Sequence, residues 1–106
     1  MSDNPLLDTL AGMTAASLEN AGLVDRELML VRLAALATVG APPASYVLNL
    51  GAAANTGLTL DDVRGVLIAI APVIGGPKVI AAAGAIFEAL GFAIAVLEDE
   101  AAGVAE

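Results

Sequence analysis

Apolar residues recur at spacings of three and four along most of the chain, and glycine or proline falls between the apolar runs. This spacing is typical of helices that bury one face. Pro72 falls inside one run and should kink that helix or end it early. No interval alternates apolar and polar residues over a useful length, so no sheet is expected. The sequence predicts one all-α domain, 1–106, with helices at about 5–20, 25–40, 43–56, 60–74 and 77–97 and a frayed acidic tail at 98–106.

Boundary residues support these ranges. Asp25 fits the N-cap of the second helix. Pro43 fits the first turn of the third helix, because a backbone N–H at that position has no partner within the helix and proline loses nothing by lacking it. Gly57 fits a left-handed stop after the third helix. Thr59 followed by Asp62 resembles a capping box, with aspartate in place of glutamate, at the start of the fourth helix.

The last predicted helix is apolar on nearly every side, with Lys78 and Glu88 as its only charged residues. A helix of this kind must be buried nearly all round. At about 1.5 Å per residue it is roughly 30 Å long, longer than a small globule encloses easily. Gly84 and Gly91 lie seven residues apart on one face and allow close approach of another helix. This pattern predicts a contact between subunits; packing within one chain alone is the other interpretation.

Composition strengthens the expectation of self-association. The 106 residues are 58% hydrophobic without counting the 11 glycines. A single domain of this length has a radius of gyration of about 13 Å and buries a smaller share of its surface than a large one. The surplus apolar surface must therefore meet either another copy of the chain or a membrane.

Charge and residue types narrow the function further. Twelve acidic residues outweigh four basic ones for a net charge of −8, and the basic residues are scattered, which argues against nucleic-acid binding. The chain has no cysteine and no histidine, so disulfides and thiol catalysis are excluded. A transition-metal site would need carboxylates alone. We therefore expect no metal and no cofactor.

A membrane location is the weaker interpretation of the apolar surplus. The run 33–60 has no charged residue and is long enough to span a bilayer. Pro42 and Pro43 interrupt it, however, and flanking basic anchors and a tryptophan belt are missing. The first residues, MSDNPLLD, also lack the features of a signal peptide. We expect a cytoplasmic protein.

Three segments in order carry a resemblance to a known family: LMLVRLAALA, then GAAANTGLT, then DDVRGVLIAIAPVIGGPKVIAAA. Together they resemble the carboxymuconolactone decarboxylase and alkylhydroperoxidase-like superfamily over about 25–83. The resemblance implies a compact all-α bundle of about five or six helices. It also implies a ring-shaped homo-oligomer, a trimer or a hexamer.

The residues that carry the family's chemistry are replaced. The resemblance places the usual active-site histidine at Asn49, the two cysteines of the hydroperoxidase branch at Pro42 and Ser45, and an acid at Leu30. Without a cysteine pair, a thiol relay is impossible, so peroxidase activity of the family's kind is excluded. Asn49 donates and accepts hydrogen bonds but cannot act as a base near neutral pH. Any enzymatic activity would be that of a carboxy-lyase.

The third predicted helix holds three candidate ligand-binding residues. Tyr46 and Asn49 are three apart, and Ser45 is four before Asn49, so they form a polar patch on neighbouring faces. One interpretation is that they orient a ligand through hydrogen bonds. The other is that Asn49 bonds to neighbouring backbone and Tyr46 fills the family's former pocket.

Arg32 and Glu88 are charged residues in apolar surroundings. Arg32 either grips a substrate carboxylate or serves as a partly buried ion-pair partner, with Glu88 as the candidate, or as a surface group. Glu88 is a candidate proton donor, because burial in an apolar helix would favour the neutral, protonated form of its carboxyl group. Asp61 and Asp62 fit helix capping better than paired catalytic carboxylates.

Three functions remain open. The first is a divergent, oligomeric family member without peroxidase chemistry that binds a small acid or lactone. The second is an active decarboxylase on a small lactone or hydroxy acid, with a non-standard site drawn from Arg32, Tyr46, Asn49 and Glu88. The third is a small membrane protein. Whether the protein is an enzyme stays open.

Overall fold

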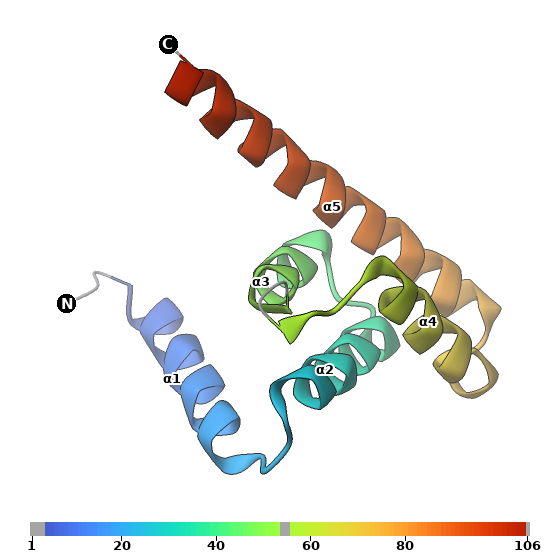
Figure 1. Ribbon diagram of the computed structural model, residues 1–106. Helices are drawn as coiled ribbons and strands as arrows, with labels where there is room; N and C mark the ends of the chain where they lie inside the picture. Colours follow the sequence, from blue (N-terminus) through green and yellow to red (C-terminus); the bar gives the residue numbers. More distant parts are fainter. Residues whose placement is uncertain (1–3, 54–55, 106) are drawn as a thin grey trace.

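Five helices make up the regular structure in the computed structural model, which describes residues 4–53 and 56–105, with side-chain surroundings at 4–49 and 56–91. These ranges contain no strand, so the all-α expectation is confirmed. Figure 1 shows their arrangement. In chain order they are α1 (Pro5–Asn20), α2 (Asp25–Val39), α3 (Pro43–Ala53), α4 (Leu60–Ile74) and α5 (Gly76–Ala105).

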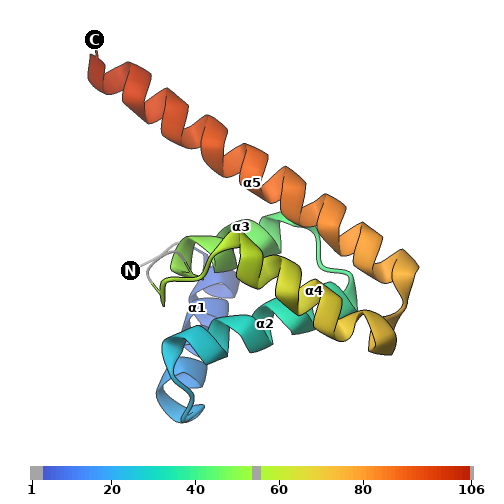
Figure 2. The same cartoon turned by 45° about the vertical axis from the view of Figure 1, so that its right-hand side comes forward.

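The helices α2 to α5 form the packed part of the molecule. Figure 2 shows the first half of α5 running across α3 and α4, and α2 packs against all three of these helices. Each of the four helices sends apolar side chains into one shared core. The buried members of this core are Leu33, Tyr46, Val63, Ile86 and Ala89.

Two helix starts follow the expected chemistry. Pro43 begins α3, and the capping box opens α4. In that box the Thr59 hydroxyl accepts from the Asp62 backbone N–H at 3.2 Å, and the Asp62 carboxylate accepts from the Thr59 backbone N–H at 2.9 Å. Gly57 has φ of +78°, the left-handed conformation expected of it. These local signals act within a few residues, which is why the sequence alone reveals them.

The start of α2 differs from the prediction. Asp25 is the first helical residue rather than the N-cap, and Val24 holds the cap position in extended conformation. The Glu27 carboxylate accepts a hydrogen bond from the Val24 backbone N–H at 3.4 Å. An acid in the first turn thus accepts from the N–H of the cap residue itself, while the valine side chain supplies no cap to the first helical N–H groups.

The helix α4 has the predicted range and does not end early at Pro72, whereas α5 runs further than predicted. The helix α4 passes Pro72 and ends at Ile74, and Gly75 with φ of +88° separates it from α5. Pro72 lies in the last turn, and its missing N–H removes one helical hydrogen bond there without ending α4 early. The helix α5 continues past Leu97 to Ala105, so the tail expected to fray is helical to that point. Alanine, the strongest helix former, recurs in this segment.

The helix α1 and the far half of α5 extend away from the core (Figure 1). The radius of gyration is 15.3 Å, compared with about 13 Å for a compact domain of this length. None of the residues of α1 is buried. Its exposed large apolar side chains are Leu6, Leu7, Leu10, Met13 and Leu18. Within the described ranges, no helix combines the length and the apolar character that crossing a bilayer requires.

Candidate functional site

Tyr46 lies in the core rather than at a surface. Its side chain has 0% exposure and packs with Leu33, Val63 and Ile86 from three other helices. Burial raises the pKa of its phenol. The hydroxyl has no hydrogen-bond partner among the described residues. Tyr46 therefore fills the space between the helices, and its role toward a ligand stays a prediction.

Asn49 is engaged by its own helix. Its side-chain Nδ2 donates to the backbone carbonyl of Ser45 at 2.8 Å, one turn earlier. The Ser45 backbone N–H in turn donates to the carbonyl of Pro42 at 3.0 Å. These bonds hold the asparagine amide along α3. A donor that is already paired is less available to orient a ligand.

Arg32 and Glu88 do not meet. The Arg32 guanidinium Nη2 donates to the Ser17 hydroxyl at 3.0 Å, which joins α2 to α1. Glu88 is exposed on α5, and no ion pair joins it to Arg32 within the described residues. The ion pair expected between these two residues is thus wrong, because Arg32 reaches toward α1 instead.

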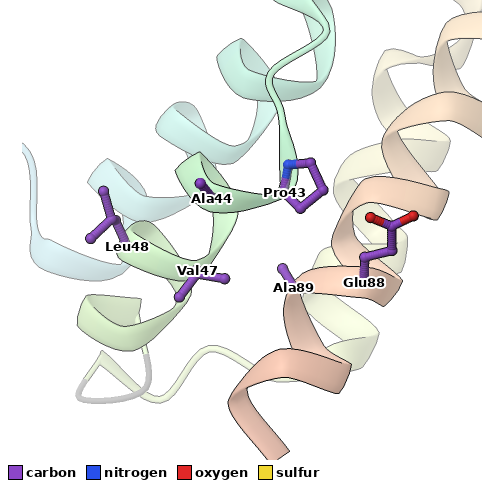
Figure 3. Close-up of a pocket in the computed structure, with 6 residues that line it drawn as sticks. All are labelled: Pro43, Ala44, Val47, Leu48, Glu88 and Ala89. Carbon is purple, nitrogen blue, oxygen red and sulfur yellow. The ribbon is translucent and has the colours of Figure 1, made fainter. Parts of the chain in front are cut away.

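A pocket of about 550 Å³ lies between α3 and α5. Its size falls in the range of small-molecule sites, roughly 300–1,000 Å³. Figure 3 shows Glu88 with its carboxylate toward Pro43, and Ala89 directed toward α3. Among the described residues of the lining, Glu88 is the only charged one. The lining residues are Pro43, Ala44, Val47, Leu48, Glu88 and Ala89.

The local sequence explains why α3 presents an apolar wall here. Pro43, Ala44, Val47 and Leu48 follow one another at spacings of one and three, so they share one face of the helix. Tyr46 points instead into the core, and its neighbour Val47 packs against the core from the partly buried edge. The α5 side is formed by Ala89, whose small side chain leaves room, with Glu88 at the rim.

Glu88 is the one predicted site residue that lines this pocket. Arg32, Ser45, Tyr46 and Asn49 lie outside the lining, although three of them belong to α3. The apolar lining residues were missed by sequence reasoning, because they carry no chemical signal. Their spacing along α3 was visible, but nothing in the sequence distinguished this stripe from a buried one.

Negative charge dominates the electrostatics of the pocket. Each basic residue has a partner elsewhere: Arg26 binds Asp62, Arg32 binds Ser17, Arg64 binds Asp61, and Lys78 binds the carbonyl of Thr38. None of them lines the pocket, so Glu88 faces it without a countercharge. No cluster of acidic side chains able to hold a metal ion occurs in the part of the chain that the structure describes.

Among known protein families, the carboxymuconolactone decarboxylase family matches the chain over residues 4–88. The match covers most of the chain and includes every helix from α1 to the first half of α5. The protein therefore belongs to the carboxymuconolactone decarboxylase family. No curated protein and no solved structure matches it. The matched range includes the lining residues of the pocket except Ala89, and the positions at which the resemblance places the family's catalytic residues.

Proposed function

We propose that the protein is a self-associating member of the carboxymuconolactone decarboxylase family that binds a small, neutral, largely apolar molecule of the lactone class. The pocket between α3 and α5 is the observation that carries this proposal. Thiol peroxidase chemistry is excluded because the chain has no cysteine. Ligand binding is the first part of the proposal, and self-association is the second.

The charge of the pocket favours a lactone over an acid. Among the described lining residues, Glu88 is the only charged one. An anionic ligand would meet this charge and the net charge of −8 of the chain, with no basic side chain in the lining to offset them. A neutral lactone avoids the repulsion and gains from contact with the apolar wall of α3.

The exposed apolar surface supports self-association. The helix α1 has no buried residue, and a free helix of its 16 residues is only marginally stable in water. On α5, Ile80 and Phe87 are 74% and 80% exposed. Contiguous apolar faces of this kind mark interaction surfaces in soluble proteins. Contact with further copies of the chain would cover them.

The binding proposal is tested with a lactone and its hydrolysis product. We expect isothermal titration to show that δ-decalactone binds at least about tenfold more tightly than 5-hydroxydecanoate, which is about 1.4 kcal/mol. The substitution Glu88→Gln should reduce this preference, because it removes the charge that repels the acid. Equal binding of the two compounds, or tighter binding of the acid, would overturn the neutral-ligand assignment.

A pocket-filling variant locates the binding. Ala44 lines the pocket, and Ala44→Phe should weaken lactone binding by about tenfold or more by occupying its volume. Ala35→Phe is the matched control, because Ala35 is exposed on α2 outside the lining. Unchanged affinity in Ala44→Phe would show that the lactone binds elsewhere.

A carboxy-lyase reaction on a carboxylated lactone or hydroxy acid in the same pocket is the second candidate. Glu88 is the one lining residue that can take up or release a proton, which an acid–base reaction requires. Decarboxylation would, however, place a substrate carboxylate near Glu88 without a cation, so binding is better supported. Release of CO₂ from a carboxylated lactone that is seen with the wild type and is absent with Glu88→Gln would establish the lyase.

A further inference from the structure

Four residues form a straight exposed line along α5: Ile80, Gly84, Phe87 and Gly91. Their spacings are four, three and four, the heptad pattern by which one helix face follows a partner helix. All four are exposed, and none belongs to the core that α5 shares with α2, α3 and α4. We call these four residues the α5 seam.

Large and small side chains alternate along the α5 seam. Ile80 and Phe87 are the large members and are 74% and 80% exposed. Gly84 and Gly91 are the small ones, and no atom lies within 4 Å of where a Cβ would be placed on either. The seam thus presents two knobs and two open holes on one helix face.

We propose that the α5 seam is an interface for a second copy of the chain, which binds antiparallel about a two-fold axis between residues 85 and 86. In this arrangement Phe87 of one copy lies level with Gly84 of the other, and Ile80 lies level with Gly91. Each large side chain thus faces a glycine, and the two-fold axis repeats both contacts with the roles of the two copies exchanged. This is the arrangement that a self-complementary two-fold interface requires. This inference rests on the proposed self-association and specifies its geometry.

The order of the residues selects the antiparallel arrangement. The spacings four, three and four are the same when the helix is read backwards. The order large, small, large, small becomes small, large, small, large, so an antiparallel partner places a small residue opposite each large one. A parallel pair in register would set Phe87 against Phe87 and leave a gap where the glycines meet. Closely packed interfaces avoid both overpacking and voids, so the antiparallel pair is favoured.

The extent of the contact predicts a reversible dimer. An antiparallel pair centred between residues 85 and 86 overlaps over 76–95, which at 1.5 Å per residue is about 30 Å. The heptad spacing implies a shallow crossing near 20°, and glycines permit a short distance between the axes. A single helix pair buries less than the roughly 1,600 Å² of a standard interface. We therefore expect dissociation on dilution.

The net charge of −8 on each copy opposes any pairing, but little of this charge lies at the α5 seam. The side chains that flank the seam are Ala81, Ala83 and Glu88, and only the last is charged. In the antiparallel pair, Glu88 lies level with Ala83 of the other copy. The nearest like-charged group, the second Glu88, is offset by about five residues, or about 7.5 Å along the axis. This separation leaves only weak repulsion at physiological salt.

Sedimentation velocity on the full chain over a range of concentrations tests the pairing through a reciprocal exchange. Gly84→Phe sets phenylalanine against phenylalanine, and Phe87→Gly removes a knob, so each should raise the dimer dissociation constant at least about tenfold. The double variant Gly84→Phe with Phe87→Gly restores a knob opposite a hole. We expect its dissociation constant to return to within about threefold of the wild-type value.

Gly65→Phe is the matched control. Gly65 is an exposed helical glycine on α4 with open space around it, and it lies outside the α5 seam. Its substitution should leave the dissociation constant unchanged. Circular dichroism should show that the Gly84→Phe variant is folded, because any residue other than proline favours a helix more than glycine does.

The outcomes separate this inference from the proposed function. If Gly84→Phe associates as the wild type does, or if the double variant stays as weak as the single ones, the α5 seam is not the interface while self-association stands. If the wild type is monomeric at every concentration, both self-association and the seam are refuted. Lactone binding is measured separately and is unaffected by either result.

Discussion

The side-chain amide of Asn49 donates a 2.8 Å hydrogen bond to the backbone carbonyl of Ser45, one turn earlier in α3. The position at which the family resemblance places a catalytic histidine is thus occupied by a side chain that bonds to its own helix. The pocket next to it is formed by apolar residues and Glu88.

Replacing Asn49 should have little effect on lactone binding. We expect Asn49→Ala to leave the affinity within about twofold, because Asn49 does not line the pocket. The lost hydrogen bond costs about 1 kcal/mol, and the higher helix propensity of alanine offsets part of it. Calorimetric titration and urea unfolding measure the two effects. A large loss of affinity would instead support the ligand-orienting role predicted for Asn49.

The hydroxyl of Tyr46 should contribute nothing to stability. It is buried without a partner among the described residues, and such a group costs about 1–3 kcal/mol. We expect Tyr46→Phe to leave the free energy of unfolding unchanged or to raise it by about 1 kcal/mol. Tyr46→Ala, which leaves a cavity in the core, should lower it by about 3–5 kcal/mol. A marked destabilisation by Tyr46→Phe would show that the hydroxyl is hydrogen-bonded.

Tyr46 should also make the protein sensitive to alkali. Burial raises the pKa of its phenol, so the native state keeps a proton that the unfolded chain releases. The stability is therefore intact below the usual tyrosine pKa of about 10 and declines as the pH rises above it. Thermal unfolding between neutral pH and pH 11 should show a smaller decline in Tyr46→Phe. Parallel pH profiles would contradict this assignment.

Asp62 should make the protein sensitive to acid. The hydrogen bond from the Thr59 backbone N–H, with help from the Thr59 hydroxyl and the Arg26 guanidinium, holds the pKa of Asp62 below its usual value despite some desolvation. The resulting stability is present above the usual aspartate pKa of about 4 and is lost as the pH falls through the lower folded value. In thermal unfolding at acid pH, Asp62→Asn should make the stability fall less steeply as the pH is lowered. Asp8→Asn on the exposed α1 is the control.

Two glycines should respond to alanine in opposite directions. Gly57 has φ of +78°, and Gly65 is in α4; an added Cβ meets no atom within 4 Å at either. We expect Gly57→Ala to lower the free energy of unfolding by about 1 kcal/mol through backbone strain. Gly65→Ala should raise it by up to about 1 kcal/mol through helix propensity. Urea unfolding that gives the same sign for both would contradict the left-handed conformation of Gly57.

Glu88 illustrates how much of the candidate site was predictable. A lone acid in an apolar helix stands out in the sequence, and it is the predicted residue that lines the pocket. Its partners in the lining could not be found in the same way. Val47 and Leu48 look like any other apolar helix positions, and their place at a pocket depends on where α5 crosses α3.

The sequence by itself determined the helices and most of their ends, because these depend on interactions within a few residues. The period of the apolar positions, the capping box of Thr59 and Asp62, and the left-handed Gly57 all act locally. Only the tertiary structure decided which helix faces meet. Tyr46 and Val47 are neighbours in the chain, but Tyr46 lies in the core and Val47 lines the pocket. Successive side chains of a helix point in different directions, so the packing of the other helices around α3 decides what each one contacts.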